Sequence, residues 1–317
     1  MDKTKKISII IPTFNEQDNV DELHRRIVQS MNQSGYEYEI VFVDDGSTDR
    51  TYEHLEKLHA ADGRVKVISL SRNFGHQAAI LAGLDAAAGQ AVIMMDGDLQ
   101  HPPEQLPLML NKWEEGYEIV SMVREKTPDA GFFKNFTASV FYFLINLIGN
   151  VHIERHAADF RLVNGSVAQT LRNMRERSRF QRGLIGWVGF KKISLPYSAG
   201  ERFAGQRKYT FRKMLLFALD AVVSFSAFPL RMSAFLGFIA IILALIYFIY
   251  IIYVKVAGFT VPGWTSTLAV IIFFGGVQLL ILGVIGEYIS RIYEETKQRP
   301  VYIVRRSLGF HEEKNKI

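Results

Sequence analysis

The 317-residue chain contains no cysteine, and this absence excludes several kinds of chemistry at once. Disulfides, thiolate metal sites and cysteine nucleophiles all need the missing thiol. The sequence also shows no signal peptide, because the apolar run from Ile7 to Ile11 ends at Pro12 and is too short for one. We therefore expect an N-terminal part that stays in the cytosol and works without thiol chemistry.

The net charge and the hydropathy of the chain indicate which kinds of partner it can bind. The formal net charge of +5 and the pI of about 9.2 suit nucleic acid, an anionic membrane surface or a phosphorylated substrate. No basic run interleaved with aromatic residues lies outside the membrane-flanking segments, so a nucleic-acid partner is not expected. Hydrophobic residues make up 49% of the chain and are concentrated in its C-terminal third, which predicts a membrane part.

From residue 7 to about residue 125, short apolar runs alternate with stretches of helical period. This alternation is typical of an α/β fold, a mostly parallel sheet with crossover helices that binds a nucleotide. The predicted strands are Ser8 to Ile11, Glu39 to Val43, Val65 to Leu70, Ala91 to Met95 and Ile119 to Val123. The predicted helices are Glu16 to Gln33, Asp49 to Asp62, His76 to Ala88 and Pro103 to Glu115.

Parallel sheets bind ligands at the carboxyl ends of their strands. The residues that follow the predicted strands are largely polar or charged: Pro12 to Glu16, Asp44 to Asp49, Ser71 to Gly75, Asp96 to Asp98, and Arg124. We therefore expect the functional site at this edge of the sheet.

Two later segments, residues 232–254 and 268–290, are long and apolar enough to be membrane helices, since about 20 apolar residues cross the hydrocarbon core. Buried helices of a soluble core are the alternative. The connecting loop 255–267 holds one basic residue, Lys255, whereas basic residues gather before and after the pair. By the positive-inside rule, both ends are expected on the cytoplasmic side of the cell membrane, as in a multi-pass protein.

The remaining boundaries follow from this arrangement. Residues 1–209 are expected to form the cytoplasmic α/β domain, residues 210–231 an interfacial juxtamembrane segment, and residues 291–317 a cytoplasmic basic tail. Residues 132–149 are apolar but interrupted by polar side chains such as Lys134, so a helix lying at the bilayer surface or against the sheet is expected rather than a full span.

The motif Asp96-Gly97-Asp98 follows the fourth predicted strand. Alternate residues of an extended chain point the same way, so both carboxylates can approach one cation, and Gln100 can add a third oxygen. Such oxygen ligands suit Mg²⁺ or Mn²⁺ on a diphosphate. A solvated turn is the alternative for an isolated motif of this kind, and the position at a strand end favours the metal site.

The stretch Asp44 to Asp49 has a structural and a functional interpretation. Ser47 or Thr48 can cap the next helix, and Asp49 suits its first turn. Capping does not require two consecutive carboxylates at the sheet edge. One of them, with Asp45 preferred, is expected to accept hydrogen bonds from a nucleobase or ribose.

These motifs occur in order along the chain, as Ile9 to Glu16, Val43 to Asp49, Ser71 to Gly75 and Met95 to Glu104. Together they resemble the family 2 glycosyltransferases with a GT-A fold. The resemblance is strongest to the polyprenyl-phosphate branch, which includes bactoprenol glucosyltransferases, the undecaprenyl-phosphate formamidoarabinose transferase and dolichyl-phosphate mannose synthase. It covers nearly the whole chain, including the two C-terminal membrane helices.

The resemblance implies roles for individual residues. The nucleotide is expected on Pro12, Thr13, Asn15, Glu16, Asp45, Arg72 and Asp96. The divalent metal is expected on Asp96, Asp98 and Gln100. The acceptor phosphate is expected on Arg124, Lys134, Arg202 and Lys208. Relatives carry arginine in place of Lys134, which bears on the role of that residue. Many relatives carry serine in place of Arg207, which bears on how the basic loop closes over its substrate.

Residues His156 to Leu162 resemble the acceptor-side motif, whose aspartate is Asp159 here. An ordinary surface pair between Asp159 and Arg161 is the alternative. Processive family members use a Gln-x-x-Arg-Trp motif, and the nearest stretch, Gln181 to Trp187, does not match its spacing. Single-sugar transfer is therefore favoured.

Asp98 and Asp159 are the expected catalytic residues, Asp98 through the metal on the departing diphosphate and Asp159 by orienting groups rather than by abstracting a proton. The resemblance implies inverting transfer of one sugar to polyprenyl phosphate in the bilayer, with UDP-glucose as the favoured donor. Mannose, galactose, N-acetylglucosamine and formamidoarabinose donors are alternatives. A non-catalytic, membrane-bound nucleotide-sugar binder is the rival, and a homo-oligomer is compatible with the sequence.

Overall fold

The computed structural model describes residues 5–125, 157–177, 179, 181–198, 228–258 and 263–310. These residues belong to two compact units. Of the described residues, the sheet unit takes in 5–125, 157–177, 179, 181–198 and 299–310, and the hairpin unit takes in 228–258 and 263–298. Each unit is described by itself.

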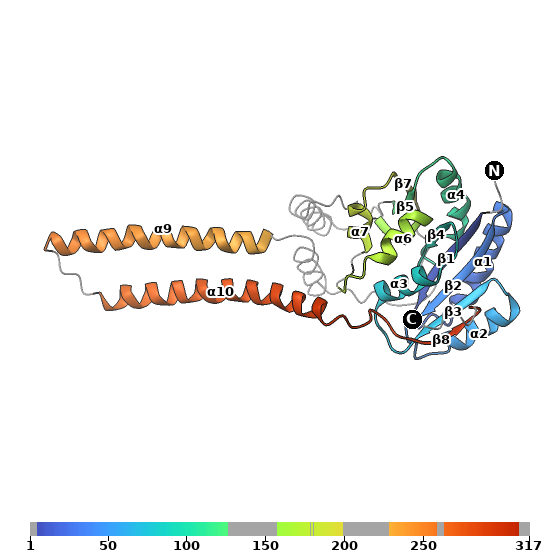
Figure 1. The fold of residues 1–317 in the computed structure, drawn as a ribbon, viewed down its shortest axis with the longest axis horizontal. Coiled ribbons are helices and arrows are strands. Elements are labelled where there is room, and N and C mark those ends of the chain that lie inside the picture. The colour runs from blue at the N-terminus through green and yellow to red at the C-terminus, as the bar shows by residue number, and fades with distance from the viewer. Residues whose placement is uncertain are drawn as a thin grey trace. The chain divides into compact units, whose positions relative to one another are not determined.

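The sheet unit is built on an 8-stranded sheet with the order β7-β5-β6-β4-β1-β2-β3-β8 (Figure 1). The strands are β1 Lys6–Thr13, β2 Glu37–Asp44, β3 Val65–Leu70, β4 Ala91–Met94, β5 Ile119–Arg124, β6 Ala157–Asn164, β7 Lys192–Tyr197 and β8 Val304–Leu308. Strand β1 pairs in parallel with β2 and β4, β2 with β3, and β5 with β7. Strand β6 is antiparallel to β4 and β5, and β8 is antiparallel to β3. The predicted α/β fold with a mostly parallel sheet is confirmed.

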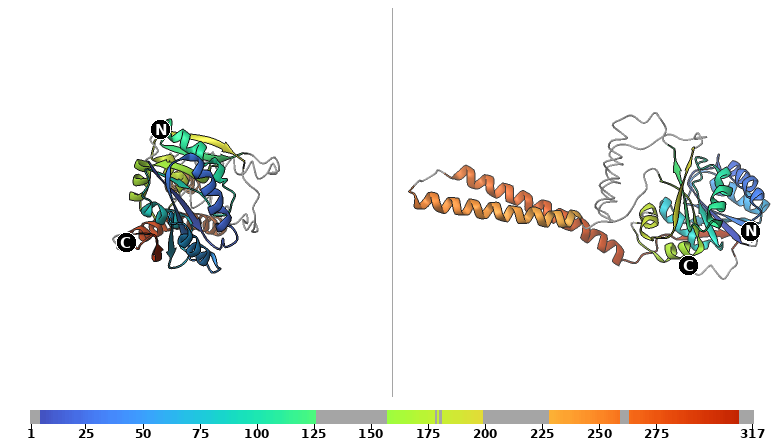
Figure 2. Two further views of the ribbon diagram at one scale, coloured as in Figure 1. Left: turned by 90° about the vertical axis from the view of Figure 1, so that its right-hand side faces the viewer. Right: turned by 90° about the horizontal axis from the view of Figure 1, so that it is seen from above.

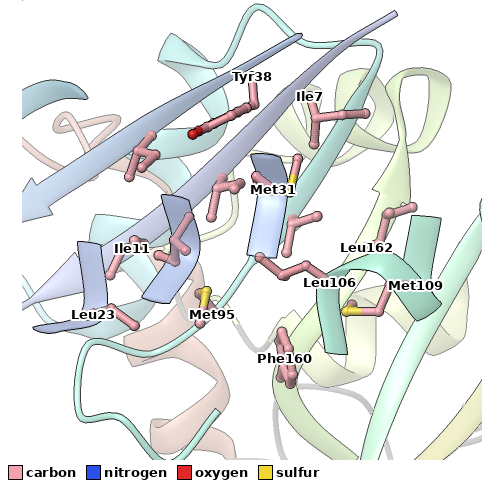
Figure 3. Packing of buried hydrophobic residues seen from close by; sticks show 14 of the residues in the cluster. Ile7, Ile11, Leu23, Met31, Tyr38, Met95, Leu106, Met109, Phe160 and Leu162 are labelled. Carbon is pink, nitrogen blue, oxygen red and sulfur yellow. The ribbon is translucent and has the colours of Figure 1, made fainter. Parts of the chain in front are cut away.

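Helices cover both faces of this sheet. They are α1 Val20–Ser34, α2 Thr51–Ala61, α3 His76–Ala86, a 3₁₀ turn η1 Pro103–Gln105, α4 Leu106–Glu114, α6 Gly165–Asn173 and α7 Gln181–Trp187. Ile9 and Ile11 of β1 belong to one buried cluster with Leu23 of α1, and Figure 3 labels Ile11 and Leu23 in it. Ile10, between them in the strand, belongs to a second cluster with Leu81 of α3. Successive strand residues point to opposite faces, so a strand covered on both sides is apolar at every position.

One carboxylate is buried within the sheet. Glu39 of β2 accepts hydrogen bonds from the Ser8 hydroxyl at 2.6 Å and the Ala88 amide at 2.8 Å, and its other oxygen pairs with Lys6 at 2.7 Å and Lys66 at 3.0 Å. Burial alone would raise the pKa of Glu39, but these partners outweigh it and lower the pKa to about 2. The charged carboxylate therefore ties β1, β2, β3 and the end of α3 together.

The hairpin unit consists of two long helices, α9 Phe228–Val256 and α10 Trp264–Thr296, which run side by side (Figures 1 and 2). Their most apolar stretches have mean hydropathies of 2.9 and 2.7, and no part of them is buried inside the protein. A soluble core helix would be covered by protein, so a lipid environment suits these surfaces better. Both helices extend beyond the predicted spans 232–254 and 268–290.

Two boundary predictions need revision. Helix α9 begins at Phe228, so the last residues of the expected interfacial segment 210–231 belong to the helix; the rest of that segment and residues 132–149 lie outside the described residues. The expected basic tail 291–317 is also more than a tail. Helix α10 continues to Thr296, and β8 then joins the sheet. The sequence does not predict β8 because the strand contains two adjacent arginines instead of an apolar run. A strand at the edge of a sheet can keep such polar residues exposed.

Candidate active site

The loops after β1 and β2 are fastened to each other at the carboxyl edge of the sheet. The Asp45 amide donates to the Thr13 carbonyl at 2.9 Å, and the Asn15 amide donates to the Ser47 hydroxyl at 3.0 Å. The Thr48 amide donates to Asn15 Oδ1 at 2.8 Å. Asn15 has a φ of 57°, a left-handed conformation that asparagine adopts more readily than most residues. The two loops therefore form one rigid rim.

Glu16 and Pro12, the other residues expected on the nucleotide, lie in the same rim. The Glu16 amide donates to the Thr51 hydroxyl at 2.8 Å, and the Glu16 carboxylate accepts from Asn19 Nδ2 at 2.5 Å. The Pro12 carbonyl lies beside Gly97, where a Cβ atom would come within 3.3 Å of it. The structure thus brings the β1 and β4 loops together, and the nucleotide contacts of these residues stay predictions.

Asp45 holds the loop that follows β3. Its Oδ1 accepts from the Phe74 amide at 2.7 Å and its Oδ2 accepts from the Gly75 amide at 2.9 Å. Burial raises the pKa of Asp45, and these two amides act in the opposite direction. The predicted contact of Asp45 with a nucleobase or ribose remains a prediction, while its bonds to the 71–75 loop are a role that sequence reasoning missed.

The same loop presents Arg72 at the surface. The Arg72 guanidinium stacks over the Phe74 ring, 4.0 Å from its centroid, and donates to the Asn73 carbonyl at 2.9 Å. Gly46, with a φ of +69°, lets the backbone of Arg72 and Asn73 pass close by. Arg72 is exposed, as an arginine that meets a diphosphate or a base must be.

The Asp96 to Gln100 turn contains a strained residue. Leu99 has a φ of 61° and its side chain is buried, an uncommon conformation for a large apolar residue. The Gln100 amide donates to Asp98 Oδ1 at 3.1 Å, and Arg124 Nη1 donates to Gln100 Oε1 at 3.4 Å. Asp98, Gln100 and Arg124, all predicted for the site, are thereby linked.

The carboxylate of Asp96 provides a test of the predicted metal site. Its Oδ1 is buried and has no hydrogen-bond partner, a state that costs free energy unless a cation or donor arrives. Within the described residues, no group of three or more His, Asp or Glu side chains is arranged to hold a metal ion. Two aspartates and an amide oxygen nonetheless fit Mg²⁺ or Mn²⁺, since these ions keep waters and take substrate oxygens. The ligand assignment stays a prediction.

Asp159 lies in β6, next to β4, and is buried rather than part of a surface pair. Arg161 Nη2 donates to Asp159 Oδ1 at 3.0 Å, and the Arg182 guanidinium lies 3.4 Å from each carboxylate oxygen. Burial would raise the pKa of Asp159, but the positive charges of Arg182 and Arg161 outweigh it, so the pKa is lowered. Asp159 is therefore an ionised carboxylate held between two guanidinium groups.

His76 links this cluster to the Asp96 turn. Its Nε2 lies 3.4 Å from Asp96 Oδ1 and 3.8 Å from Asp159 Oδ2. On the other side of Asp96, the buried His101 ring accepts from the Asp96 amide through Nδ1 at 2.9 Å and stacks on Phe160, with centroids 5.0 Å apart. The two predicted catalytic regions are thus adjacent.

Sequence reasoning missed His76, His101 and Arg182. His76 directly follows the Ser71 to Gly75 loop, where the sequence predicts only the start of a helix. Arg182 stands in the stretch compared only with the processive motif. Of the residues predicted for the acceptor phosphate, Arg124 lies at the site, and Lys134, Arg202 and Lys208 lie outside the described residues.

Comparisons with known proteins identify the family of this chain. Residues 8–172 match Glycosyl transferase family 2, and residues 228–292 match the GtrB C-terminal hairpin. The uncharacterized glycosyltransferase YkcC of Bacillus subtilis (strain 168) is 42% identical over 310 residues, covering 98% of this chain and 96% of that protein. The bactoprenol glucosyl transferase of Shigella phage SfII is 40% identical over 303 residues, covering 95% of this chain and 98% of that protein.

Among solved structures, mannosyl-3-phosphoglycerate synthase from Rubrobacter xylanophilus is similar, with 18% identity and a TM-score of 0.48 over 73% of this chain and 75% of that one. The family match covers the strands and loops that build the site, and the relatives align over nearly their whole length. This chain therefore belongs to glycosyl transferase family 2, with a GT-A-type sheet unit and a GtrB-type hairpin.

Proposed function

We propose that this glycosyltransferase transfers one hexose, with inversion, from a nucleotide diphosphate sugar to polyprenyl phosphate in the membrane. UDP-glucose is the favoured donor. The observation that carries the proposal is the occurrence, in one chain, of the Asp96–His76–Asp159 cluster and an apolar two-helix hairpin. The near full-length similarity to a protein named bactoprenol glucosyl transferase supports glucose and a lipid phosphate as the substrates.

The donor side follows from the rim and the Asp96 turn. The loops of residues 12–16 and 71–75, with Asp45 between them, would bind the nucleotide. Asp96, Asp98 and Gln100 would hold Mg²⁺ or Mn²⁺, which supplies a Lewis acid for the departing diphosphate when bound. Asp96 Oδ1 is buried, accepts no hydrogen bond and lies 3.4 Å from His76 Nε2, which supports this assignment.

The chemistry of the acceptor is consistent with an ionised, weakly basic Asp159. A phosphate monoester has a second pKa of about 6, so at neutral pH it is already a competent nucleophile and needs no strong base. Asp159, whose pKa is lowered by Arg182 and Arg161 against burial, is a weak base. We assign it the role of orienting Arg182 and the groups around the anomeric carbon. Arg124 and Arg182 supply positive charge for phosphate oxygens.

The membrane arrangement also follows. We propose that α9 and α10 cross the bilayer and that the intervening loop, within residues 255–267, lies on the far side. Residues 5–125 and 299–310 belong to the same unit, which supports the proposal that both ends of the hairpin lie on one side of the membrane. The basic residues flanking the hairpin favour the cytoplasmic side.

The experiment is a substrate panel with the purified full chain in lipid vesicles. Labelled UDP-glucose, UDP-galactose, UDP-N-acetylglucosamine and GDP-mannose are each incubated with polyprenyl phosphate, with and without a chelator. We expect label in the lipid fraction with UDP-glucose, lost on chelation. Nucleotide binding without transfer to lipid from any donor would favour the non-catalytic binder instead.

Matched variants separate the metal assignment from general damage. Asp98→Asn is expected to abolish transfer while the chain remains folded. Glu22→Gln is the control, because Glu22 is a carboxylate on the surface of α1 paired with Arg25. Normal turnover of Asp98→Asn would refute the metal assignment, and loss of activity in both variants would show an unspecific effect.

A further inference from the structure

The C-terminal segment, residues 299–310, returns to the sheet unit after the hairpin. Its strand β8 lies beside β3 in Figure 1, with Val67 opposite Leu308, Ser69 opposite Arg306 and Leu70 opposite Val304. The segment thus covers one edge of the sheet. The next two strands, β3 and β2, are followed by the loops of residues 71–75 and 45–49, which are proposed to bind the nucleotide.

A buried tyrosine anchors this segment. The Tyr302 hydroxyl donates to Asp85 Oδ2 at 2.6 Å. The same carboxylate accepts hydrogen bonds from Arg175 Nη1 at 2.7 Å and Arg175 Nη2 at 3.0 Å. Burial raises the pKa of Tyr302, and the adjacent Asp85 carboxylate raises it further, so the hydroxyl stays protonated and remains a donor. A hydrogen bond to a charged, shielded acceptor is among the stronger ones that a neutral side chain makes.

The next residue contacts the 71–75 loop directly. The Ile303 carbonyl accepts from the Ser71 amide at 2.9 Å, one residue before Arg72. At the other end of the same loop, Asp45 holds the amides of Phe74 and Gly75. The 71–75 loop is therefore fixed at both ends, at one end by β2 and at the other by a residue that follows both hairpin helices in the chain.

We infer that the C-terminal segment, anchored by Tyr302, is a positioning element for donor binding. It holds Ser71 in place, so Arg72 is presented to the nucleotide in one geometry. Only Lys297 and Gln298 separate the segment from α10, so the segment links the hairpin to the 71–75 loop along the chain. This inference rests on the proposed role of the 71–75 loop in nucleotide binding.

The test compares two tyrosine variants of the full chain in detergent or vesicles. Tyr302→Phe removes the bond to Asp85 and keeps the buried ring. Tyr36→Phe is the matched control, because Tyr36 is also buried and its hydroxyl donates to the Glu114 carboxylate at 2.9 Å. We expect Tyr302→Phe to raise the dissociation constant for UDP and the KM for UDP-glucose by about tenfold, equivalent to roughly 1.4 kcal/mol. The kcat and the KM for polyprenyl phosphate should not change, and Tyr36→Phe should leave all four values unchanged.

A disulfide provides the reverse experiment. Val67 and Leu308 are register partners of an antiparallel pair, whose Cα atoms lie about 4.5–5.5 Å apart and within disulfide range. The chain has no native cysteine, so Val67→Cys with Leu308→Cys adds the only thiols. In the Tyr302→Phe background, oxidation should restore UDP affinity and reduction should remove it again.

The possible results distinguish a failure of the positioning role from a failure of the proposed function. Wild-type UDP affinity in Tyr302→Phe, or equal weakening in Tyr36→Phe, would overturn the positioning role and leave the proposed function intact. A wild-type chain that binds neither UDP nor UDP-glucose would overturn both. If reduced Tyr302→Phe does not fold, the oxidised cysteine pair in that background decides instead, with wild-type UDP affinity expected and an affinity about tenfold weaker contradicting the inference.

Discussion

Replacing Gly46 with alanine tests the geometry of the nucleotide rim. Gly46 has a φ of +69°, and a Cβ atom there would lie 2.5 Å from the Arg72 carbonyl carbon and 2.7 Å from the Asn73 nitrogen. The left-handed conformation alone costs an alanine about 1 kcal/mol. Ordinary van der Waals contact begins at 3.4 Å, so the Arg72 backbone must also move by about 1 Å.

That displacement sets the expected effect on function. A misplacement of about 1 Å in a substrate-positioning group costs on the order of 100-fold in rate. We therefore expect Gly46→Ala to lower kcat/KM for the nucleotide sugar by about 100-fold, equivalent to roughly 2.7 kcal/mol. The assay is steady-state transfer to polyprenyl phosphate with the donor concentration varied.

Gly116→Ala is the control for backbone strain. Gly116 has a φ of +89° and no atom within 4 Å of its would-be Cβ, so alanine pays the conformational cost without a clash. It should lose about 1 kcal/mol of unfolding free energy and keep its donor kcat/KM. If the two variants had the same donor kcat/KM, the close packing of Gly46 against the Arg72 loop would not matter for donor binding, and the reasoning would be refuted.

Further predictions concern two buried carboxylates. Glu39 has its pKa lowered from 4.5 to about 2, so its charged form contributes about 3 kcal/mol of stability that is fully present above about pH 4.5 and is lost as the pH falls towards 2. Glu39→Gln should remove most of this contribution in denaturant unfolding followed by tryptophan fluorescence, while the KM for the donor stays unchanged; a stability equal to wild type at pH 7 would contradict the ion-pair account. Asp159→Asn should lower kcat by at least about 10-fold, because Arg161 and Arg182 lose their shared partner. Its pH–rate profile between about pH 6 and 8 should keep the wild-type shape, since the lowered pKa leaves Asp159 ionised throughout; loss of a titrating limb would reveal a base.

The sequence predicts the first half of the sheet well for a physical reason. Strands β1 to β5 are covered on both faces or bounded by polar turns, so each appears as an apolar run followed by charged residues. Strands β6 and β8 break that pattern. Strand β6 carries Asp159 and Arg161, which neutralise each other inside the protein, and β8 carries two exposed arginines at a sheet edge. A hydropathy pattern shows neither the buried ion pair in β6 nor the edge position of β8, so it predicts neither strand.

The residues of the site also fall into those that the sequence predicts and those that it does not. Residues at strand ends, such as Asp45, Asp96 and Arg124, could be located because the carboxyl edge of a parallel sheet is a known position. His76 and Arg182 could not, since each begins or lies within a helix that is brought to the edge only by tertiary packing. The bond from Ser71 to Ile303 joins residues on either side of the hairpin, and no local signal encodes it.

The central claim is tested most directly by the mass of the lipid product. The purified full chain in vesicles is incubated with UDP-glucose, undecaprenyl phosphate and Mg²⁺ or Mn²⁺, and the lipid fraction is analysed by mass spectrometry. We expect a polyprenyl phosphate heavier by a single hexose residue, formed with release of UDP and absent with Asp98→Asn. A ladder of several hexoses, or UDP binding without any glycosylated lipid from any nucleotide sugar, would contradict it.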